Sequence, residues 1–117
     1  SGDGGFMMNS QELETAVRLN LDLVVIILND NAYGMIKWKQ EGMGFENFGL
    51  DYSNPDFVQY AQSFGAFGYR PDSCDAFVSI LHKAINSKGV HLIDLPVDYS
   101  LNHLILNELL QNKSCLV

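Results

Sequence analysis

Two aspartates in this sequence stand in short turns whose neighbours suit the binding of a charged ligand. Asp3 lies in the glycine-rich segment 2–5, and Asp30 lies 27 positions later in the asparagine-rich segment 29–32. Glycine lets the backbone come close to a phosphate group, and carboxylate oxygens are ligands that Mg²⁺ prefers. These residues therefore predict a site that holds a diphosphate through a divalent cation.

One helix and one strand are predicted between the two turns. Segment 11–19 has apolar residues at helical spacing, with Ser10 or Asn9 as the N-cap. Segment 23–28 is apolar throughout and largely β-branched, which is typical of a parallel strand covered on both faces. A right-handed crossover of this kind would bring both turns to the carboxyl ends of neighbouring strands, where open α/β sheets bind ligands. The residues expected on or near the inner face of the helix are Leu13, Ala16, Val17 and Leu19.

A divalent cation is expected at this site because two carboxylates would otherwise repel a diphosphate. Mg²⁺ binds about six oxygens and takes several of them from phosphate and water. Asp3 and Asp30 can supply side-chain oxygens, and a backbone carbonyl in the 30–34 turn can supply another. The N-terminus of the helix that follows a turn offers free N–H groups to the diphosphate.

Two other ligand motifs fit this sequence less well. A dinucleotide-binding G-x-G-x-x-G motif fails because Met7 stands where the third glycine belongs. A Ca²⁺ loop over residues 29–40 has Gly34 at its sixth position but no carboxylate at its first or last. Turns favour Gly, Asp and Asn in any case, so the prediction rests on the two turns occurring together across one crossover.

The middle of the chain predicts a short helix over residues 35–40 and an irregular stretch over residues 42–54. That stretch is rich in glycines and aromatic residues, and such loops often line a site. Asn54 is expected to cap the next helix, which runs to about Phe64 and ends at Gly65.

The second half of the chain predicts strands over residues 67–70 and 90–95. Between them, Ser73 is expected to cap a helix over residues 75–86, and Gly89 is expected to end it. The inward-facing residues of this helix should be Phe77, Ile80, Leu81, Ala84 and Ile85. Alternating strands and helices predict an α/β fold of three layers, with helices on both faces of a mostly parallel sheet.

Length and charge limit the possible functions. With 117 residues, of which 47% are apolar, the chain can form one packed domain. Its net charge of −7 disfavours nucleic acid as a partner. The longest apolar run, residues 23–28, is far shorter than the roughly 20 residues that cross a bilayer. No membrane segment is therefore expected.

The cysteines and histidines do not predict a metal site of their own. Cys74 and Cys115 lack any metal-binding spacing, and they suit reduced thiols in a cytoplasmic protein. His82, His91 and His103 likewise share no ligand spacing, so structural or surface roles are expected for them.

The two turns together resemble a family motif. A glycine-aspartate-glycine turn followed by an Asn-Asp pair resembles the thiamine diphosphate motif of pyruvate decarboxylases, acetolactate synthases and their relatives. Residues 11–16 (QELETA), 29–36 (NDNAYGMI) and 95–100 (LPVDYS) also look like acetolactate synthase. Two features resemble the catabolic, FAD-independent type of acetolactate synthase. They are Asp30, at a position where many relatives carry Asn, and the PVDY segment near the end of the chain. The resemblance implies the C-terminal, pyrophosphate-binding domain, incomplete at its start, over residues 1–117.

This resemblance implies particular ligands. Mg²⁺ would be bound by Asp3, Asp30 and the backbone oxygen of Ala32. Met35 resembles a family residue near the cofactor, although its position also suits a core methionine. Biosynthetic relatives carry a tryptophan one position beyond Trp38, so no substrate-selecting role is assigned to Trp38. The implied cofactor-binding residues are Gly2, Asp3, Gly4, Gly5, Asp30, Ala32, Tyr33, Gly34 and Met35.

The resemblance also implies an activity. Acetolactate synthases join two molecules of pyruvate, or pyruvate and another 2-oxo acid, with loss of CO₂, and they act as homo-oligomers. The glutamate that activates their cofactor lies in an N-terminal pyrimidine-binding domain, and no glutamate of this chain corresponds to it. We therefore expect no catalytic residue in this chain and no carboligase activity from it alone.

Two alternatives remain open from the sequence. The protein could be another 2-oxo acid decarboxylase or carboligase, such as a benzoylformate or indolepyruvate decarboxylase. It could instead be a non-catalytic domain that serves in subunit association, with its apolar tail at 101–110 available to a partner. The resemblance leaves an FAD requirement open.

Overall fold

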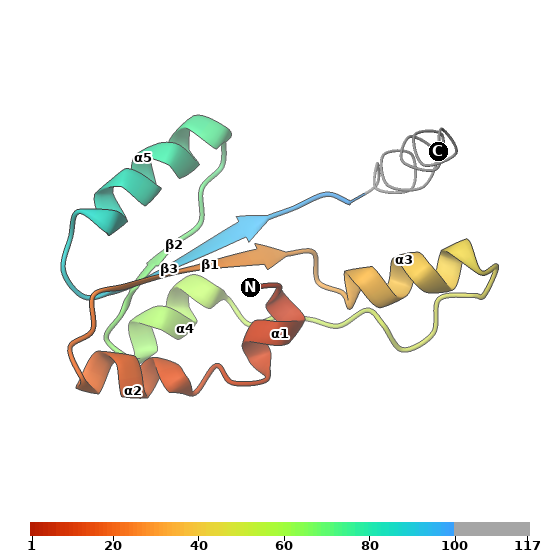
Figure 1. Ribbon diagram of the computed structural model, residues 1–117, viewed down its shortest axis with the longest axis horizontal. Helices are drawn as coiled ribbons and strands as arrows, with labels where there is room; N and C mark the ends of the chain where they lie inside the picture. The colour runs from red at the N-terminus through yellow and green to blue at the C-terminus, as the bar shows by residue number, and fades with distance from the viewer. Residues whose placement is uncertain (100–117) are drawn as a thin grey trace, which may run out of the picture.

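The sheet of this protein is parallel, as the sequence predicts. The computed structural model describes residues 1–99, in which the three strands are β1 (Leu23–Asn29), β2 (Phe67–Tyr69) and β3 (Val90–Pro96). Their order is β1-β3-β2, with Ile26 and Tyr69 both in register with Ile93 (Figure 1). The central β3 is the most deeply buried strand.

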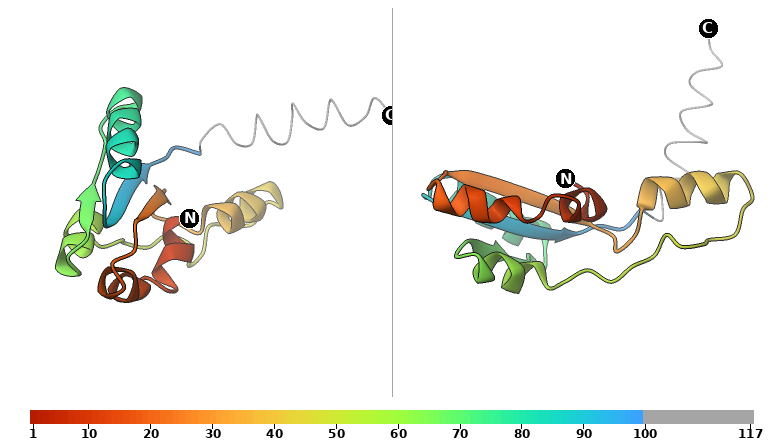
Figure 2. Two further views of the ribbon diagram at one scale, coloured as in Figure 1. Left: turned by 60° about the vertical axis from the view of Figure 1, so that its left-hand side comes forward. Right: turned by 90° about the horizontal axis from the view of Figure 1, so that it is seen from below.

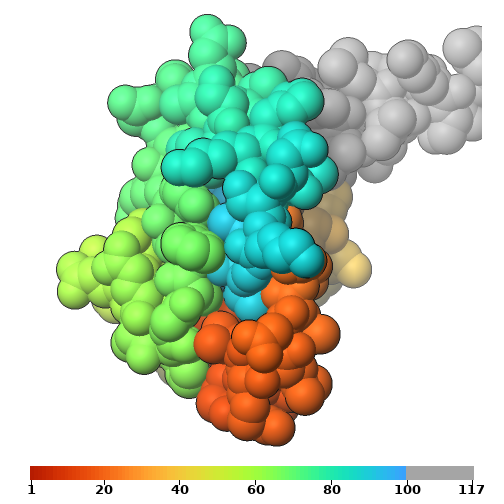
Figure 3. Space-filling view, turned by 90° about the vertical axis from the view of Figure 1, so that its left-hand side faces the viewer, coloured from red at the N-terminus to blue at the C-terminus, as the bar shows by residue number. Residues whose placement is uncertain are grey.

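Helices cover both faces of this sheet, which confirms the predicted α/β class. In Figure 1, α5 (Cys74–Ile85) lies on one face, and α2 (Glu12–Arg18) and α4 (Phe57–Ser63) lie on the other. Figure 3 shows these three helices around the beginning of β3. The prediction of an irregular turn over residues 2–5 is wrong for Asp3, Gly4 and Gly5, which form the first turn of the short helix α1 (Asp3–Met7). Helix α3 (Gly34–Gly42) extends beyond the carboxyl end of β1 (Figure 2).

The apolar core lies between the sheet and the α2–α4 layer. Phe57 and Ile27 are fully buried there, and the Phe57 ring meets that of Phe6 edge-on at a centroid distance of 5.6 Å. Gly68 allows α4 to approach β2, because a Cβ atom at Gly68 would lie 2.6 Å from the Val58 carbonyl oxygen. Because Phe57 is the first residue of α4, its burial in the core fixes where the chain enters α4.

Several apolar residues are more exposed than predicted. Leu19 is 56% exposed because α2 ends at Arg18 and the next residue has left the helix. Ile85, the last residue of α5, is 65% exposed, whereas Ala84 before it is buried. The prediction that β1 is covered on both faces is also wrong at its ends, where Leu23 and Leu28 are exposed. Within residues 1–99, β1 is an edge strand.

Two predicted N-caps are wrong, whereas one predicted N-cap and one predicted helix-ending glycine are confirmed. Ser10 and Asn9 do not cap α2; the Ser10 hydroxyl instead accepts a hydrogen bond from Tyr60 at 2.8 Å. Asn54 does not cap α4, because that helix begins at Phe57 and Asp56 accepts from its first N–H groups. Ser73 does cap α5, and Gly65 does follow α4, with a φ of +83°.

Gly89 does not itself end α5, which stops at Ile85. It lies in the turn before β3, with a φ of +100°, and donates its N–H to Asp22. Across the described residues, no helix is long and apolar enough to cross a membrane. The predictions for the 101–110 tail, His103 and Cys115 concern residues outside the described range.

Candidate cofactor site

The two turns meet at one edge of the sheet. Gly2 forms a parallel bridge with Leu28 at the end of β1, and the Leu28 N–H donates to the Ser1 carbonyl at 2.8 Å. The first turn therefore lies beside the carboxyl end of β1, where the second turn begins. This is the position at which open α/β sheets bind ligands, and it agrees with the geometry that the crossover predicts.

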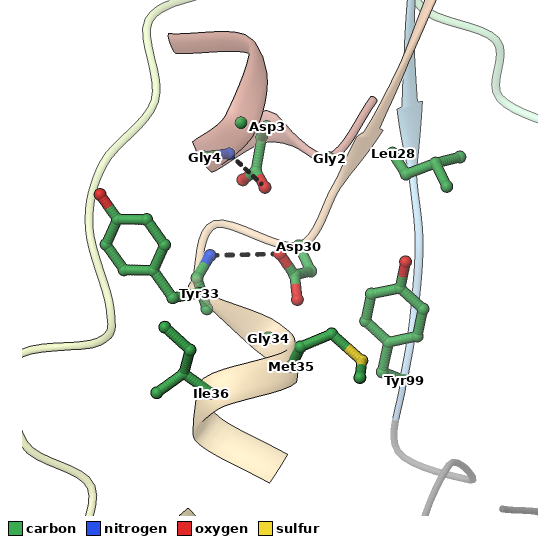
Figure 4. A pocket seen from close by; sticks show the side chains of 12 residues that line it. Gly2, Asp3, Gly4, Leu28, Asp30, Tyr33, Gly34, Met35, Ile36 and Tyr99 are labelled. Atoms are coloured by element: carbon green, nitrogen blue, oxygen red, sulfur yellow. Dashed lines mark hydrogen bonds between the residues drawn. The ribbon is translucent and has the colours of Figure 1, made fainter. Parts of the chain in front are cut away.

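A cavity of about 530 Å³ lies between these turns. Figure 4 shows Asp3 above it, with Asp30 and the start of α3 below. The residues predicted from the sequence that line this cavity are Gly2, Asp3, Gly4, Gly5, Asp30, Ala32, Tyr33, Gly34 and Met35. The structure thus brings all the candidate residues together, at the carboxyl end of the sheet.

Sequence reasoning missed three further residues that line the cavity, namely Leu28, Ile36 and Tyr99. Leu28 is at the end of the apolar run that predicts β1, and Ile36 follows Met35 in α3. Tyr99 comes shortly after β3, whose carboxyl end reaches the same edge of the sheet. Following β1 and β3 to their carboxyl ends could have found Leu28 and Tyr99, whereas Ile36 is positioned by the start of α3.

Asp3 is only 2% exposed and is held by three donors. Its Oδ1 accepts from the Gly4 N–H at 3.0 Å. Its Oδ2 accepts from the Asn31 N–H at 2.9 Å and from the Asn54 side-chain amide at 2.6 Å. These hydrogen bonds offset the cost of burying a carboxylate and link the first turn directly to the second.

Asp30 carries the second carboxylate of the site. Burial raises the pKa of Asp30, the hydrogen bond from the Ala32 N–H lowers it in part, and the negative charge of Asp3 raises it again. Figure 4 shows the Asp3 and Asp30 side chains opposite each other. A cation between them would replace this repulsion with two attractive contacts.

Two glycines at the site are required by close contacts. A Cβ atom at Gly4 would lie 2.8 Å from the Tyr52 hydroxyl oxygen and 2.9 Å from the Tyr33 ring. A Cβ atom at Gly34 would collide with Oδ2 of Asp30. The two positions therefore need glycine to keep the aromatic and acidic side chains in place, a reason distinct from close approach to a phosphate.

Tyr52 contacts the predicted backbone ligand. Its hydroxyl donates to the Ala32 carbonyl oxygen at 3.3 Å. Burial and the charges of Asp3 and Asp30 raise the pKa of Tyr52 above its ordinary value, so the hydroxyl remains a donor. A carbonyl oxygen has two lone pairs, and the Ala32 oxygen can still face a cation.

Asn54 is a site residue that the sequence assigned to another role. Its side-chain amide nitrogen lies 2.6 Å from Asp3 Oδ2, 3.0 Å from Asn29 Oδ1 and 3.2 Å from Asn31 Oδ1. Asn54 is the last residue of the irregular stretch 42–54. The composition of that stretch is typical of loops that line a site, and this was the only sequence feature that could have pointed to Asn54.

The donor set suits a cation that also binds a ligand. Among residues 1–99, no group of three or more His, Cys, Asp or Glu side chains could hold a metal ion. The carboxylates of Asp3 and Asp30 and the carbonyl of Ala32 are hard oxygen donors, too few to enclose Mg²⁺ alone. Mg²⁺ commonly takes its other ligands from phosphate and water, so these residues fit Mg²⁺ with a bound diphosphate.

Comparison with known proteins identifies the family. Residues 1–95 match the family described as "Thiamine pyrophosphate enzyme, C-terminal TPP binding domain". The chain belongs to this family. Its thiamine pyrophosphate-binding domain is 45% identical to acetolactate synthase from Bacillus subtilis (strain 168) over 102 residues, or 87% of this chain and 18% of that protein. It is 38% identical to the catabolic acetolactate synthase of Raoultella terrigena over 109 residues, or 93% of this chain and 20% of that protein.

Solved structures of thiamine pyrophosphate enzymes share the fold. The thiamine diphosphate-dependent 4-hydroxybenzoylformate decarboxylase of Rhodococcus jostii RHA1 superposes with a TM-score of 0.78 and 26% identity, over 83% of this chain and 19% of that one. The chain spans about a fifth of the length of all these relatives. The comparisons confirm the resemblance to acetolactate synthase and the fold class.

Proposed function

We propose that this chain binds the diphosphate of thiamine diphosphate through Mg²⁺, as part of an enzyme of the acetolactate synthase type. The observation that carries the proposal is the convergence of two carboxylates from separate glycine- and asparagine-rich turns on one cavity. The identity to acetolactate synthases supports the choice of enzyme. The reaction would join two pyruvates to 2-acetolactate with loss of CO₂.

The proposed cation ligands are the side chains of Asp3 and Asp30 and the carbonyl of Ala32. The glycines of segment 2–5 would lie beside the diphosphate, since they leave the backbone accessible there. When bound, thiamine diphosphate supplies an electron sink for decarboxylation of a 2-oxo acid. The residues of this chain would bind and orient the cofactor through its charged end.

An apolar wall is proposed for the uncharged part of the cofactor. Met35 is 60% exposed, so it is not a core residue within the described part of the chain. Its side chain extends along the cavity toward Tyr99 (Figure 4), and Leu28 and Ile36 line the same cavity. These side chains can contact an aromatic ring, whereas the acidic residues hold the diphosphate.

Further protein is proposed to complete the site. Because the chain spans about a fifth of its relatives, we propose that a pyrimidine-binding domain supplies the glutamate that activates the cofactor, and that the enzyme is a homo-oligomer. The exposed apolar residues on α3 and the following segment support an association surface there. They are Met35, Ile36, Met43, Phe45 and Phe48.

A second candidate reaction is favoured by the solved structures. The superposition on a 4-hydroxybenzoylformate decarboxylase makes simple decarboxylation of a 2-oxo acid the alternative. The two reactions would use the same diphosphate and cation site, so they differ in the fate of the decarboxylated substrate. Product analysis separates them.

Calorimetric titration of thiamine diphosphate tests the proposed site. Binding should require Mg²⁺, disappear with a chelator, and weaken at least about tenfold in Asp3→Ala or Asp30→Ala, since each change removes a hard ligand. The control is Asp75→Ala, because Asp75 is an exposed carboxylate in the first turn of α5 and does not line the cavity. Metal-independent binding that both site variants retain would refute the assignment.

A further inference from the structure

We infer that Asn54 is a positioning residue for the Asp3 carboxylate, anchored by a chain of polar contacts that ends at Arg70. The inference rests on the proposed function, because it assigns a role to the groups behind the proposed cation ligand. We call Asp3, Asn54, Asn29, Asp94 and Arg70 the polar chain. It runs along the carboxyl ends of the three described strands.

The contacts of the polar chain are between 2.6 and 3.2 Å long. Asn54 donates to Asp3 Oδ2 at 2.6 Å and to Asn29 Oδ1 at 3.0 Å. The Asn29 amide donates to Asp94 Oδ1 at 2.8 Å, and Arg70 Nη1 lies 3.2 Å from Asp94 Oδ2. The hydrogen bonds made by the Asp3 and Asp94 carboxylates belong to the class of hydrogen bond that is stronger than one between two neutral groups.

The interior members of the polar chain are buried. Asn29 is 6% exposed and Asp94 is 1% exposed, whereas the Arg70 side chain is 55% exposed. A buried carboxylate requires partners, and Asp94 has Arg70 on one oxygen and Asn29 on the other. Because the side-chain nitrogen of Asn29 donates to Asp94, the side-chain oxygen of Asn29 faces Asn54.

The orientation of Asn54 follows from its neighbours. Three acceptor oxygens, from Asp3, Asn29 and Asn31, surround its side-chain nitrogen. A flipped amide would place an oxygen against the Asp3 carboxylate, so the nitrogen must face the site. The Asn54 carbonyl oxygen is buried without a hydrogen-bond partner. Leaving such an acceptor unsatisfied costs free energy.

The same contacts hold the second turn. The Asn31 N–H donates to Asp3 Oδ2 at 2.9 Å and to Asn29 Oδ1 at 3.2 Å. Asn29 therefore orients both Asn54 and the backbone just before Ala32. A change at Asn54 or Arg70 should disturb the distance between the proposed ligands without removing any of them.

The test measures cation affinity directly. Mn²⁺ replaces Mg²⁺ as the probe, with thiamine diphosphate present, and free Mn²⁺ is followed by electron paramagnetic resonance in the protein that carries this chain. Asn54→Ala should weaken Mn²⁺ binding about tenfold, as loss of groups behind metal ligands commonly does. Arg70→Ala should weaken it by a smaller factor. Tyr60→Phe is the control, because it removes a half-buried hydroxyl that contacts Ser10 outside the polar chain.

A double variant separates positioning from general destabilisation. Residues that act through one chain of contacts have non-additive effects, so Arg70→Ala should cost less Mn²⁺ affinity in the Asn54→Ala background than in the wild type. The part that remains acts through the contact of Asn29 with the Asn31 N–H. Circular dichroism checks that each variant is folded. If Asn54→Ala does not fold, the Mn²⁺ affinity of Arg70→Ala tests the inference by itself. The Arg70 side chain is largely exposed, so we expect this variant to fold.

The outcomes distinguish the inference from the proposed function. Wild-type affinity for Mn²⁺ in both folded single variants would overturn the inference and leave the proposed function standing. Additive losses in the double variant would also overturn it. A wild-type protein that binds no Mn²⁺ with thiamine diphosphate would refute the proposed function itself.

Discussion

Gly34 shows how a residue without a side chain shapes the acidic site. A Cβ atom there would collide with Oδ2 of Asp30, so the absence of a side chain sets the position of a proposed cation ligand. Asp30 is also the residue whose pKa is raised by burial and by the nearby Asp3. A small displacement of Asp30 would therefore alter both the ligand geometry and the repulsion that a cation relieves.

Gly34→Ala should weaken Mg²⁺-dependent binding of thiamine diphosphate about tenfold, because the new methyl group must push Asp30 away from its present position. Calorimetric titration measures the change. Gly42→Ala is the matched control, since it lies at the other end of α3 and a Cβ atom there meets nothing within 4 Å. Equal affinities for thiamine diphosphate in the two variants would show that binding does not depend on the present position of the Asp30 side chain.

At the residue scale, the nine positions that the sequence predicts to bind the cofactor line one cavity, whereas the contacts of Asn54 with Asp3 and Asn29 were not predicted. The glycines and aspartates were recognisable because residue type and spacing alone limit what they can do. Asn54 was assigned to a helix cap because Asn-Pro-Asp suits both an N-cap and a turn. Its contacts with Asp3 and Asn29 join residues 51 and 25 positions away, which local sequence patterns do not reveal.

At the element scale, the start of α4 is fixed by Asp56. Its Oδ1 accepts from the Val58 and Gln59 N–H groups at 2.9 and 3.0 Å. These bonds, with the Gln59 N–H contributing most, lower the pKa of Asp56 below its ordinary value. The ionised cap therefore stabilises the fold above the unfolded-state pKa, and this contribution is lost as the pH falls through the lower folded-state pKa.

Asp56→Ala should consequently lower the melting temperature at pH 7, and its difference from wild type should shrink in acid as the wild-type cap becomes protonated. Thermal unfolding followed by circular dichroism between pH 7 and pH 2 measures this. Asp56→Asn keeps an uncharged cap and should lose stability less steeply in acid than the wild type. A difference between Asp56→Ala and wild type that is constant over the whole pH range would contradict the cap assignment.

The order and type of the elements from α2 onwards were predictable, but α1 and several element ends were not. Apolar periodicity and glycine positions were sufficient for β1, β3, α4 and α5. The cap of α2 was wrong because the Ser10 hydroxyl bonds to Tyr60, a partner 50 positions away. Leu19 and Ile85 were placed in the core because periodicity does not show where a helix stops.

At the scale of the whole molecule, we propose that this chain anchors the cofactor and that the complete reaction needs further protein. The chain spans about a fifth of the length of its acetolactate synthase relatives. None of its described residues lining the cavity is a glutamate, the residue type that the resemblance assigns to cofactor activation.

The purified 117-residue chain should therefore form no acetolactate from pyruvate, even with Mg²⁺ and thiamine diphosphate. The protein that carries this chain together with a pyrimidine-binding domain should form it, as mass spectrometry of the products would detect. Aldehyde as the main product of that protein would instead favour the decarboxylase alternative. Acetolactate formation by the isolated chain would contradict the proposal that activation comes from elsewhere.

One cation should join the two turns to a diphosphate. A crystal structure with thiamine diphosphate and Mn²⁺, analysed by anomalous scattering, would locate that cation. We expect one anomalous peak in the 530 Å³ cavity, within coordination distance of Asp3, Asp30 and the Ala32 carbonyl, and beside the cofactor's diphosphate. A diphosphate bound in that cavity without a metal peak, or a peak that lies away from both aspartates, would contradict this expectation.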